Sequence, residues 1–273
     1  MIHTIVEMLS HNFIQRAILV GTLISLCASL LGVSLVLKRY SMIGDGLSHV
    51  GFGVLTISTA FGITSPLYIA IPCVAMASIF LIKVGNSSKI KSDSSIALIS
   101  SSALAIGVAV TSLTTGMNTD VCNFMFGSIL AMSKPDVILS VIVSIIVAIL
   151  FIIYYRKLFI VTFDENFAKA SGLKADRYTS IIAILTSLII VIGMRMMGVM
   201  LISSIIIFPA LTSMRIFKTF KKVVISSSII SVVSFLLGIY FSYIYNISTG
   251  AMIVIVNLVL FVLFSIIDKI IYE

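Results

Sequence analysis

An aspartate and a histidine stand four positions apart in residues 41–53, a segment that reads SMIGDGLSHVGFG and is otherwise poor in ionisable side chains. On a helix, Asp45 and His49 project from the same face, one turn apart. A carboxylate oxygen and an imidazole nitrogen held in this way can chelate a divalent metal ion. The spacing therefore predicts a metal or ion site on one face of a helix.

A structural role for Asp45 and His49 is the alternative, in which the two side chains bond to each other or to a neighbouring helix. Such polar contacts inside a membrane contribute about 0.6 kcal/mol. A central aspartate costs about 2.5–3.5 kcal/mol on insertion scales, so helix bonding alone does not offset it. Four glycines surround the pair and suit either close helix packing or a pore lining: Gly44, Gly46, Gly51 and Gly53.

The number of ligands limits what one chain can do. Two side chains form a poor cage, but two copies of the chain with this helix near their axis would supply two aspartates and two histidines. Four nitrogen and oxygen ligands suit Zn²⁺ and are acceptable to Mn²⁺ or Fe²⁺. We therefore expect a site shared between two copies.

The composition predicts a membrane protein. Apolar residues make up 60% of the 273 residues and charged residues only 10%, whereas soluble domains carry about 25% charged residues. The mean hydropathy is +1.24, and many apolar runs approach the roughly 20 residues that cross a bilayer. We predict one all-α membrane domain, residues 1–273, of eight or nine spans. The candidate spans are 13–37, 42–61, 65–82, 95–114, 135–155, 178–194, 197–214, 223–245 and 250–267.

The net charge of +8 is distributed unequally between alternate loops. One set holds Lys38, Arg39, Lys83, Lys89, Lys91, Arg156, Lys157, Lys169, Lys174, Arg177, Arg215, Lys218, Lys221, Lys222 and Lys269, and the other holds Arg16, Lys134 and Arg195. The positive-inside rule places the first set in the cytoplasm, with the N-terminus outside and the C-terminus inside. The excess charge thus indicates topology, and no nucleic-acid partner is expected. The short apolar run 121–132 is predicted to be a re-entrant or interfacial piece on the outer side.

The polar stretch 161–177 is predicted to be cytoplasmic and to contain a short helix. Thr162 and Glu165 fit a capping box, and Gly172 is placed to end the helix. Apolar residues share one side of this helix, namely Phe163, Phe167 and Ala170. The stretch is either a connector on the membrane surface or a docking helix that another protein binds.

Pro209, late in the seventh span, predicts a helix kink, either structural or beside a transport path. The chain contains no G-x-x-x-x-G-K-[ST] phosphate loop, so it is not itself a P-loop ATPase. It also lacks an H-E-x-x-H motif and a G-x-S-x-G elbow. We therefore expect no enzyme activity of its own.

The run from Lys38 to His49, KRYSMIGDGLSH, closely resembles the R-x-S-x-x-x-D-x-[LI]-[SA]-H signature of zinc, manganese and iron ABC importer permeases. Further segments are similar to that family's landmarks: 120–130, 163–173, 198–210 and 248–254. The last resembles a P-T-G-P motif in which serine and alanine replace the prolines. Segment 163–173 meets the E-A-A-x-x-x-G pattern only loosely.

The resemblance implies a type II ABC importer permease in a bacterial plasma membrane, surrounded by lipid. It implies a homodimer that works with a separate cytoplasmic ABC ATPase and an extracytoplasmic metal-binding protein. The transported ion, rather than a permanently bound cofactor, would be zinc first, with manganese or ferrous iron next. An ion-coupled secondary carrier that uses Asp45 and His49 as a relay is the alternative, although no clear inverted repeat is visible.

The resemblance also assigns roles to residues. Asp45 and His49 would line the metal path. The ATPase-docking candidates are Phe163, Asp164, Glu165, Phe167, Ala168 and Gly172, and the candidates for lining the channel are Ser41, Ser48, Phe52 and Pro209.

Overall fold

The computed structural model describes residue 10 and residues 12–63, 65–87, 92–114 and 134–272, and within these it contains ten α-helices and no strand. Nine helices are long. The helices are α2 (Asn12–Leu37), α3 (Ser41–Ala60), α4 (Leu67–Ser87), α5 (Ser92–Thr114), α7 (Lys134–Phe163), α8 (Glu165–Ala170), α9 (Ala175–Met197), α10 (Val199–Ile216), α11 (Phe220–Tyr245) and α12 (Thr249–Tyr272). The predicted all-α bundle is confirmed.

Each of the nine predicted spans falls on one long helix. Seven of these helices are long and apolar enough to cross a membrane. The apolar part of α4, Leu67–Lys83, is shorter, and α3 is less apolar because it carries Asp45, His49 and several serines and glycines. The predicted re-entrant piece 121–132 lies outside the described residues.

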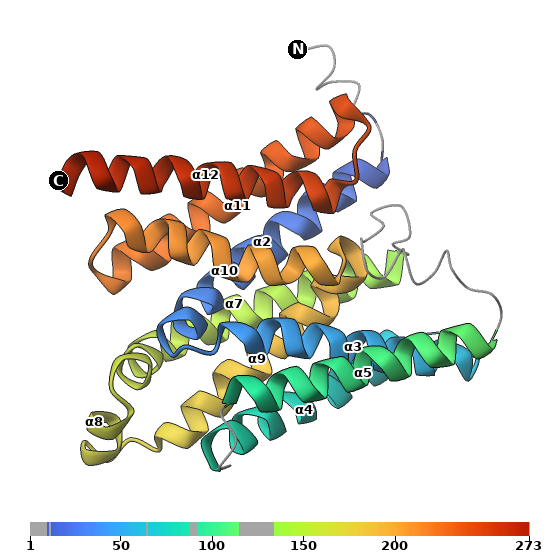
Figure 1. Cartoon of the computed structure of the whole chain (residues 1–273), viewed down its shortest axis with the longest axis horizontal. Coiled ribbons are helices and arrows are strands. Elements are labelled where there is room, and N and C mark those ends of the chain that lie inside the picture. Colours follow the sequence, from blue (N-terminus) through green and yellow to red (C-terminus); the bar gives the residue numbers. More distant parts are fainter. Residues whose placement is uncertain (1–9, 11, 64, 88–91, 115–133, 273) are drawn as a thin grey trace.

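The turns between helices gather at two opposite ends of the bundle (Figure 1). Helix α8, the α2–α3 corner, the α10–α11 turn and the C-terminal end of α12 lie at one end, whereas the α9–α10 and α11–α12 turns lie at the other. Most of the lysines and arginines of the described residues belong to the first end. By the positive-inside rule this end faces the cytoplasm.

The interior of the bundle forms around α2 and α9, the most deeply buried spans. By contrast, only 22% of the residues in the apolar stretches of α5, α7 and α12 are buried, and many of their large apolar side chains are exposed, as expected for helices that contact lipid. Helix α3 packs against α5, α4, α10 and α9. The helix that carries Asp45 and His49 is therefore held on several sides by other spans.

The start of the short cytoplasmic helix differs from the prediction. Helix α7 continues to Phe163 and includes Thr162, which is buried and does not cap α8. Tyr155, Phe159 and Phe163, at the end of α7, all contact the ring of Phe220 on α11. These contacts stabilise the last turns of α7 as helix.

The cap of α8 is Asp164, whose carboxylate accepts a hydrogen bond from the Phe167 amide at 2.8 Å. The capping box that was predicted from Thr162 is therefore wrong. Gly172 does follow the end of α8, with a φ of +83° that favours glycine.

The arrangement of the turns predicts which sites a membrane-impermeant thiol reagent can reach. In a chain whose native cysteines are replaced by serine, Ile247→Cys in the α11–α12 turn should be labelled in intact cells. Lys218→Cys in the α10–α11 turn should be labelled only after the membrane is opened, because it lies at the basic end. Strong labelling of Lys218→Cys in intact cells would contradict this orientation.

Candidate metal site

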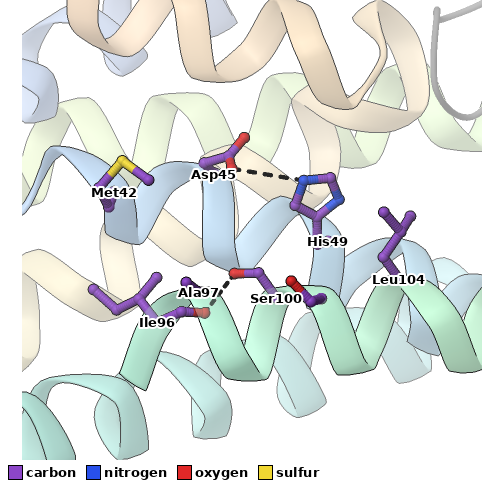
Figure 2. A pocket seen from close by; sticks show the side chains of 8 residues that line it. Met42, Asp45, His49, Ile96, Ala97, Ser100 and Leu104 are labelled. Carbon is purple, nitrogen blue, oxygen red and sulfur yellow. Dashed lines mark hydrogen bonds and ion pairs between the residues drawn. The ribbon is translucent and has the colours of Figure 1, made fainter. Parts of the chain in front are cut away.

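The local chain path places Asp45 and His49 in the first half of α3. Helix α2 ends at Leu37, and the chain reverses through Arg39, which adopts a left-handed φ of 61°. Helix α3 begins at Ser41. Asp45 and His49 follow in its second and third turns, on the same side of the helix (Figure 2).

The two predicted ligands lie close together. The His49 Nε2 atom is 3.6 Å from the Asp45 Oδ2 atom, which is an ion-pair distance and too long for a hydrogen bond. The Asp45 side chain is 43% exposed and the His49 side chain 20%. Both facing atoms can thus turn to a common ion.

A third residue orients the carboxylate of Asp45. The Ser203 hydroxyl on α10 donates to Asp45 Oδ1 at 3.4 Å. The other ring nitrogen of His49, Nδ1, is buried and has no hydrogen-bond partner. The polar bonding of the pair is therefore incomplete, which is unlike a purely structural hydrogen-bonded contact.

A cavity of about 170 Å³ adjoins Asp45 and His49 between α3 and α5 (Figure 2). It is open to the surface, and its volume is far above the roughly 10–15 Å³ that one water needs. Besides the two ligands, its lining consists of Met42, Ile96, Ala97, Ser100, Ser101 and Leu104. The pair therefore faces a space that can hold a hydrated ion.

One copy of the chain provides only part of a metal cage. Among the residues that the structure describes, no group of three or more histidine, cysteine, aspartate or glutamate side chains could hold a metal ion. Asp45 and His49 are the two such side chains that line this cavity.

The glycines around the pair serve close helix packing. A Cβ atom at Gly46 would lie 2.7 Å from Ile96 Cγ2, and one at Gly53 would lie 2.9 Å from the Ala103 carbonyl oxygen, both on α5. The sequence left packing and pore lining open, and for these two glycines the contacts favour packing. The α3–α5 contact fixes one wall of the cavity.

The other channel-lining candidates lie elsewhere. The Ser48 hydroxyl donates to the backbone oxygen of Asp45 at 2.7 Å and is fully buried, and Phe52 is buried against Gly107. Pro209 is buried within α10, and Ser41 begins α3, partly exposed. None of the four lines the cavity.

Sequence reasoning missed the contributions of Ser203 and of α5. Ser100 and Ser101 belong to a run of serines in an otherwise apolar span, and that run was the available signal. No local pattern pairs Ser203 with Asp45, because 158 residues separate them.

The docking candidates divide into an anchor and an exposed face. Ala168 is fully buried and packs with Val161 and Ala175. Phe167 is 60% exposed, and Phe163 is similarly exposed at the end of α7. The end of α7 and the short helix α8 therefore present two exposed apolar rings at the basic end of the bundle.

Comparisons with known proteins cover nearly the whole chain. A family model described as "ABC 3 transport family" matches residues 10–268. The "Manganese import system permease protein ScaB" of Streptococcus gordonii is 31% identical over 92% of this chain and 89% of its own. The "Manganese transport system membrane protein MntB" of Synechocystis is 30% identical over 96% and 85%. The structure "PsaBC from Streptococcus pneumoniae in complex with Fab" matches with a TM-score of 0.86 and 28% identity, over 97% of this chain and 95% of that one.

The packing at Gly46 predicts a stability effect. Gly46→Leu should lower the free energy of unfolding by about 1–3 kcal/mol, the usual cost of overpacking, because the new side chain has to displace Ile96. Ala97→Leu, on the same contact but facing the open cavity, is the matched control and should have little effect. Thermal unfolding in detergent measures both, and equal midpoints for the two variants would contradict the packing account.

Proposed function

Because the chain belongs to the ABC 3 transport family, we propose that it is the membrane subunit of an importer that moves Mn²⁺ into the cytoplasm with energy from a separate ATPase. The observation that carries the proposal is the Asp45–His49 pair, which faces an open cavity from within a membrane span. An ionisable pair in a span marks an ion pathway by default.

The choice of manganese rests on ligand chemistry and on the names of relatives. Carboxylate oxygen suits Mn²⁺, and imidazole nitrogen is acceptable to several divalent ions. The sequence alone placed zinc first, since the same four ligands suit it. Two relatives with about 30% identity over nearly the whole chain are named as manganese transporters, and this moves manganese ahead of zinc and iron.

A second copy of the chain completes the site in this proposal. The Asp45 carboxylate is nearly half exposed on the side of a span, where contact with lipid would cost about 2.5–3.5 kcal/mol. A partner copy that brings its own Asp45 and His49 opposite the first would remove that contact. The ion would then have two carboxylates and two imidazoles.

The geometry suits transient binding. Transport requires a site that binds the ion strongly enough to replace its water and weakly enough to release it. Ser203 holds one carboxylate oxygen of Asp45, which leaves Oδ2 and the His49 Nε2 atom facing each other. An ion-coupled carrier could use the same pair as a proton relay, but the family match favours an ATP-driven importer.

The ATPase would dock on α8 at the basic end of the bundle. Exposed aromatic side chains often bind in an apolar groove of a partner protein. Phe163 and Phe167 are exposed in this way. Asp164 caps α8 and Ala168 anchors it, so the helix is presented in one orientation. Glu165 and Gly172 belong to the same structural unit.

Removal of either ligand tests the metal site. Asp45→Ala should lower the uptake of radioactive manganese by more than about 100-fold, because even outer partners of a metal site contribute 10–100-fold. His49→Ala should impair uptake similarly, and both variants should still insert in the membrane and bind the ATPase. Ser204→Ala is the matched control, since the Ser204 hydroxyl bonds within its own helix to Met200. Wild-type uptake in the Asp45→Ala, His49→Ala double variant would refute the assignment.

A charge on the exposed ring of α8 tests the docking surface. Phe167→Asp should abolish co-purification of the ATPase together with metal-coupled ATP hydrolysis, since an ionised carboxylate is costly in an apolar contact. Phe167→Leu keeps the contact apolar and should retain both. If Phe167→Asp behaved like Phe167→Leu, α8 would be only a surface connector.

A further inference from the structure

A buried lysine lies at the corner between α2 and α3, away from the metal site. The Lys38 side chain is only 6% exposed, although lysine is almost never fully buried unless it is paired. Burial lowers the pKa of Lys38, and the carboxylate of Glu165 partly counteracts this shift. A buried ammonium group requires partners that compensate its charge.

The ammonium group of Lys38 bonds to two other elements. It donates to Glu165 Oε2 on α8 at 3.2 Å and to Thr179 Oγ1 on α9 at 2.8 Å. It also lies 5.9 Å from the centre of the Tyr40 ring. Lys38 thus joins the α2–α3 corner to the short helix that carries Phe167.

Glu165 is the first residue of α8 and holds a second lysine as well. Lys169 Nζ lies 3.1 Å from Glu165 Oε1 and 3.2 Å from Asp176 Oδ1. Its side chain is 50% exposed, so the two ion pairs of Glu165 differ in environment. An exposed pair contributes little, whereas breaking a buried pair leaves an uncompensated charge.

The corner that carries Lys38 is tightly bonded and leads directly into α3. The backbone amide of Lys38 donates to the Ser34 carbonyl at 3.0 Å, and that of Tyr40 donates to Leu35 at 2.8 Å. The amide of Ile43 then donates to Tyr40 at 3.0 Å. Hydrogen-bonded turns therefore connect Lys38 to the first turns of α3, which contain Asp45.

We propose that the Lys38–Glu165 pair is a coupling contact that transmits movement of α8 to the metal-binding helix α3. The proposal rests on the proposed docking of the ATPase at α8. The pair is buried on the Lys38 side and partly exposed on the Glu165 side, whose side chain is 27% exposed. Such a pair adds little net stability, and in this proposal its role is to hold α8 in one orientation against the corner before α3. Glu165 moves with α8, and Lys38 moves with the start of α3.

The test uses the complete transporter, with its ATPase, in lipid vesicles, where ATP hydrolysis and manganese uptake are measured in the same sample. Lys38→Met and Glu165→Gln should each lower the uptake per ATP hydrolysed by about tenfold, within the usual range of coupling between two sites. In Lys38→Met, which lies outside the proposed docking surface, hydrolysis and ATPase co-purification should stay within about twofold of wild type. The double variant should be no worse than the more affected single variant, because the two residues act as one unit.

Two control variants separate coupling from general damage. Lys38→Arg retains the charge and should retain most of the coupling. Lys169→Met removes the exposed partner of Glu165 and should change uptake per ATP by less than about twofold, as for other surface pairs.

Three results would overturn the proposal: unchanged uptake per ATP in both single variants, additive losses in the double variant, or loss of ATPase co-purification in Lys38→Met. The last result would make the pair a structural support of α8. A wild-type complex that hydrolyses ATP without taking up manganese would instead refute the proposed function itself, and the coupling contact with it.

Discussion

The cost of an ionised carboxylate inside a membrane is the constraint on which the arrangement around α3 depends. Asp45 is placed in a span, where lipid cannot solvate it. The protein supplies a hydroxyl from α10, an imidazole one turn along the same helix, and an open cavity beside α5. The hydroxyl comes from α10 and the cavity lies against α5, so the site requires α3 to be fixed relative to both of these helices.

Helix packing supplies that fixed position. Gly46 and Gly53 allow α5 to approach the backbone of α3 closely, while the buried side chains of Leu47, Phe52 and Leu55 fill the interior. At the cytoplasmic end, Lys38 holds the corner before α3 against α8 and α9. The same helix is thus held in place at its basic end and along its length, and the two proposed metal ligands lie between these contacts.

Features that depend on residues near each other in the chain were predictable from the sequence. The apolar runs predicted the nine long helices of the described residues, and the i, i+4 spacing placed Asp45 and His49 on one face. Local reasoning failed where a tertiary contact competes with a local signal. Threonine is a residue type that often caps helices, so Thr162 was a reasonable candidate. The aromatic contacts of Phe159 and Phe163 with Phe220 extend α7 past Thr162, and Asp164 caps α8 instead.

Other features carry no local signal. Lys38 bonds to residues 127 and 141 positions away, and in the sequence it is one of many basic residues that mark the cytoplasmic side. The family resemblance made Ser48 and Phe52 channel candidates, and both side chains are buried. Whether a face of α3 is buried or lines a cavity depends on which helices pack against it, and no local sequence pattern specifies those neighbours.

The central claim is that Asp45 and His49 bind the transported ion, and spectroscopy of bound manganese tests it most directly. Mn²⁺ is paramagnetic, and electron spin echo modulation detects a ligand nitrogen through its nuclear spin. In the assembled transporter loaded with Mn²⁺ in the absence of ATP, the account predicts histidine nitrogen coupling that shifts when the histidines carry ¹⁵N and disappears in His49→Ala. Bound manganese without any nitrogen coupling, or with coupling that persists in His49→Ala, would contradict the account.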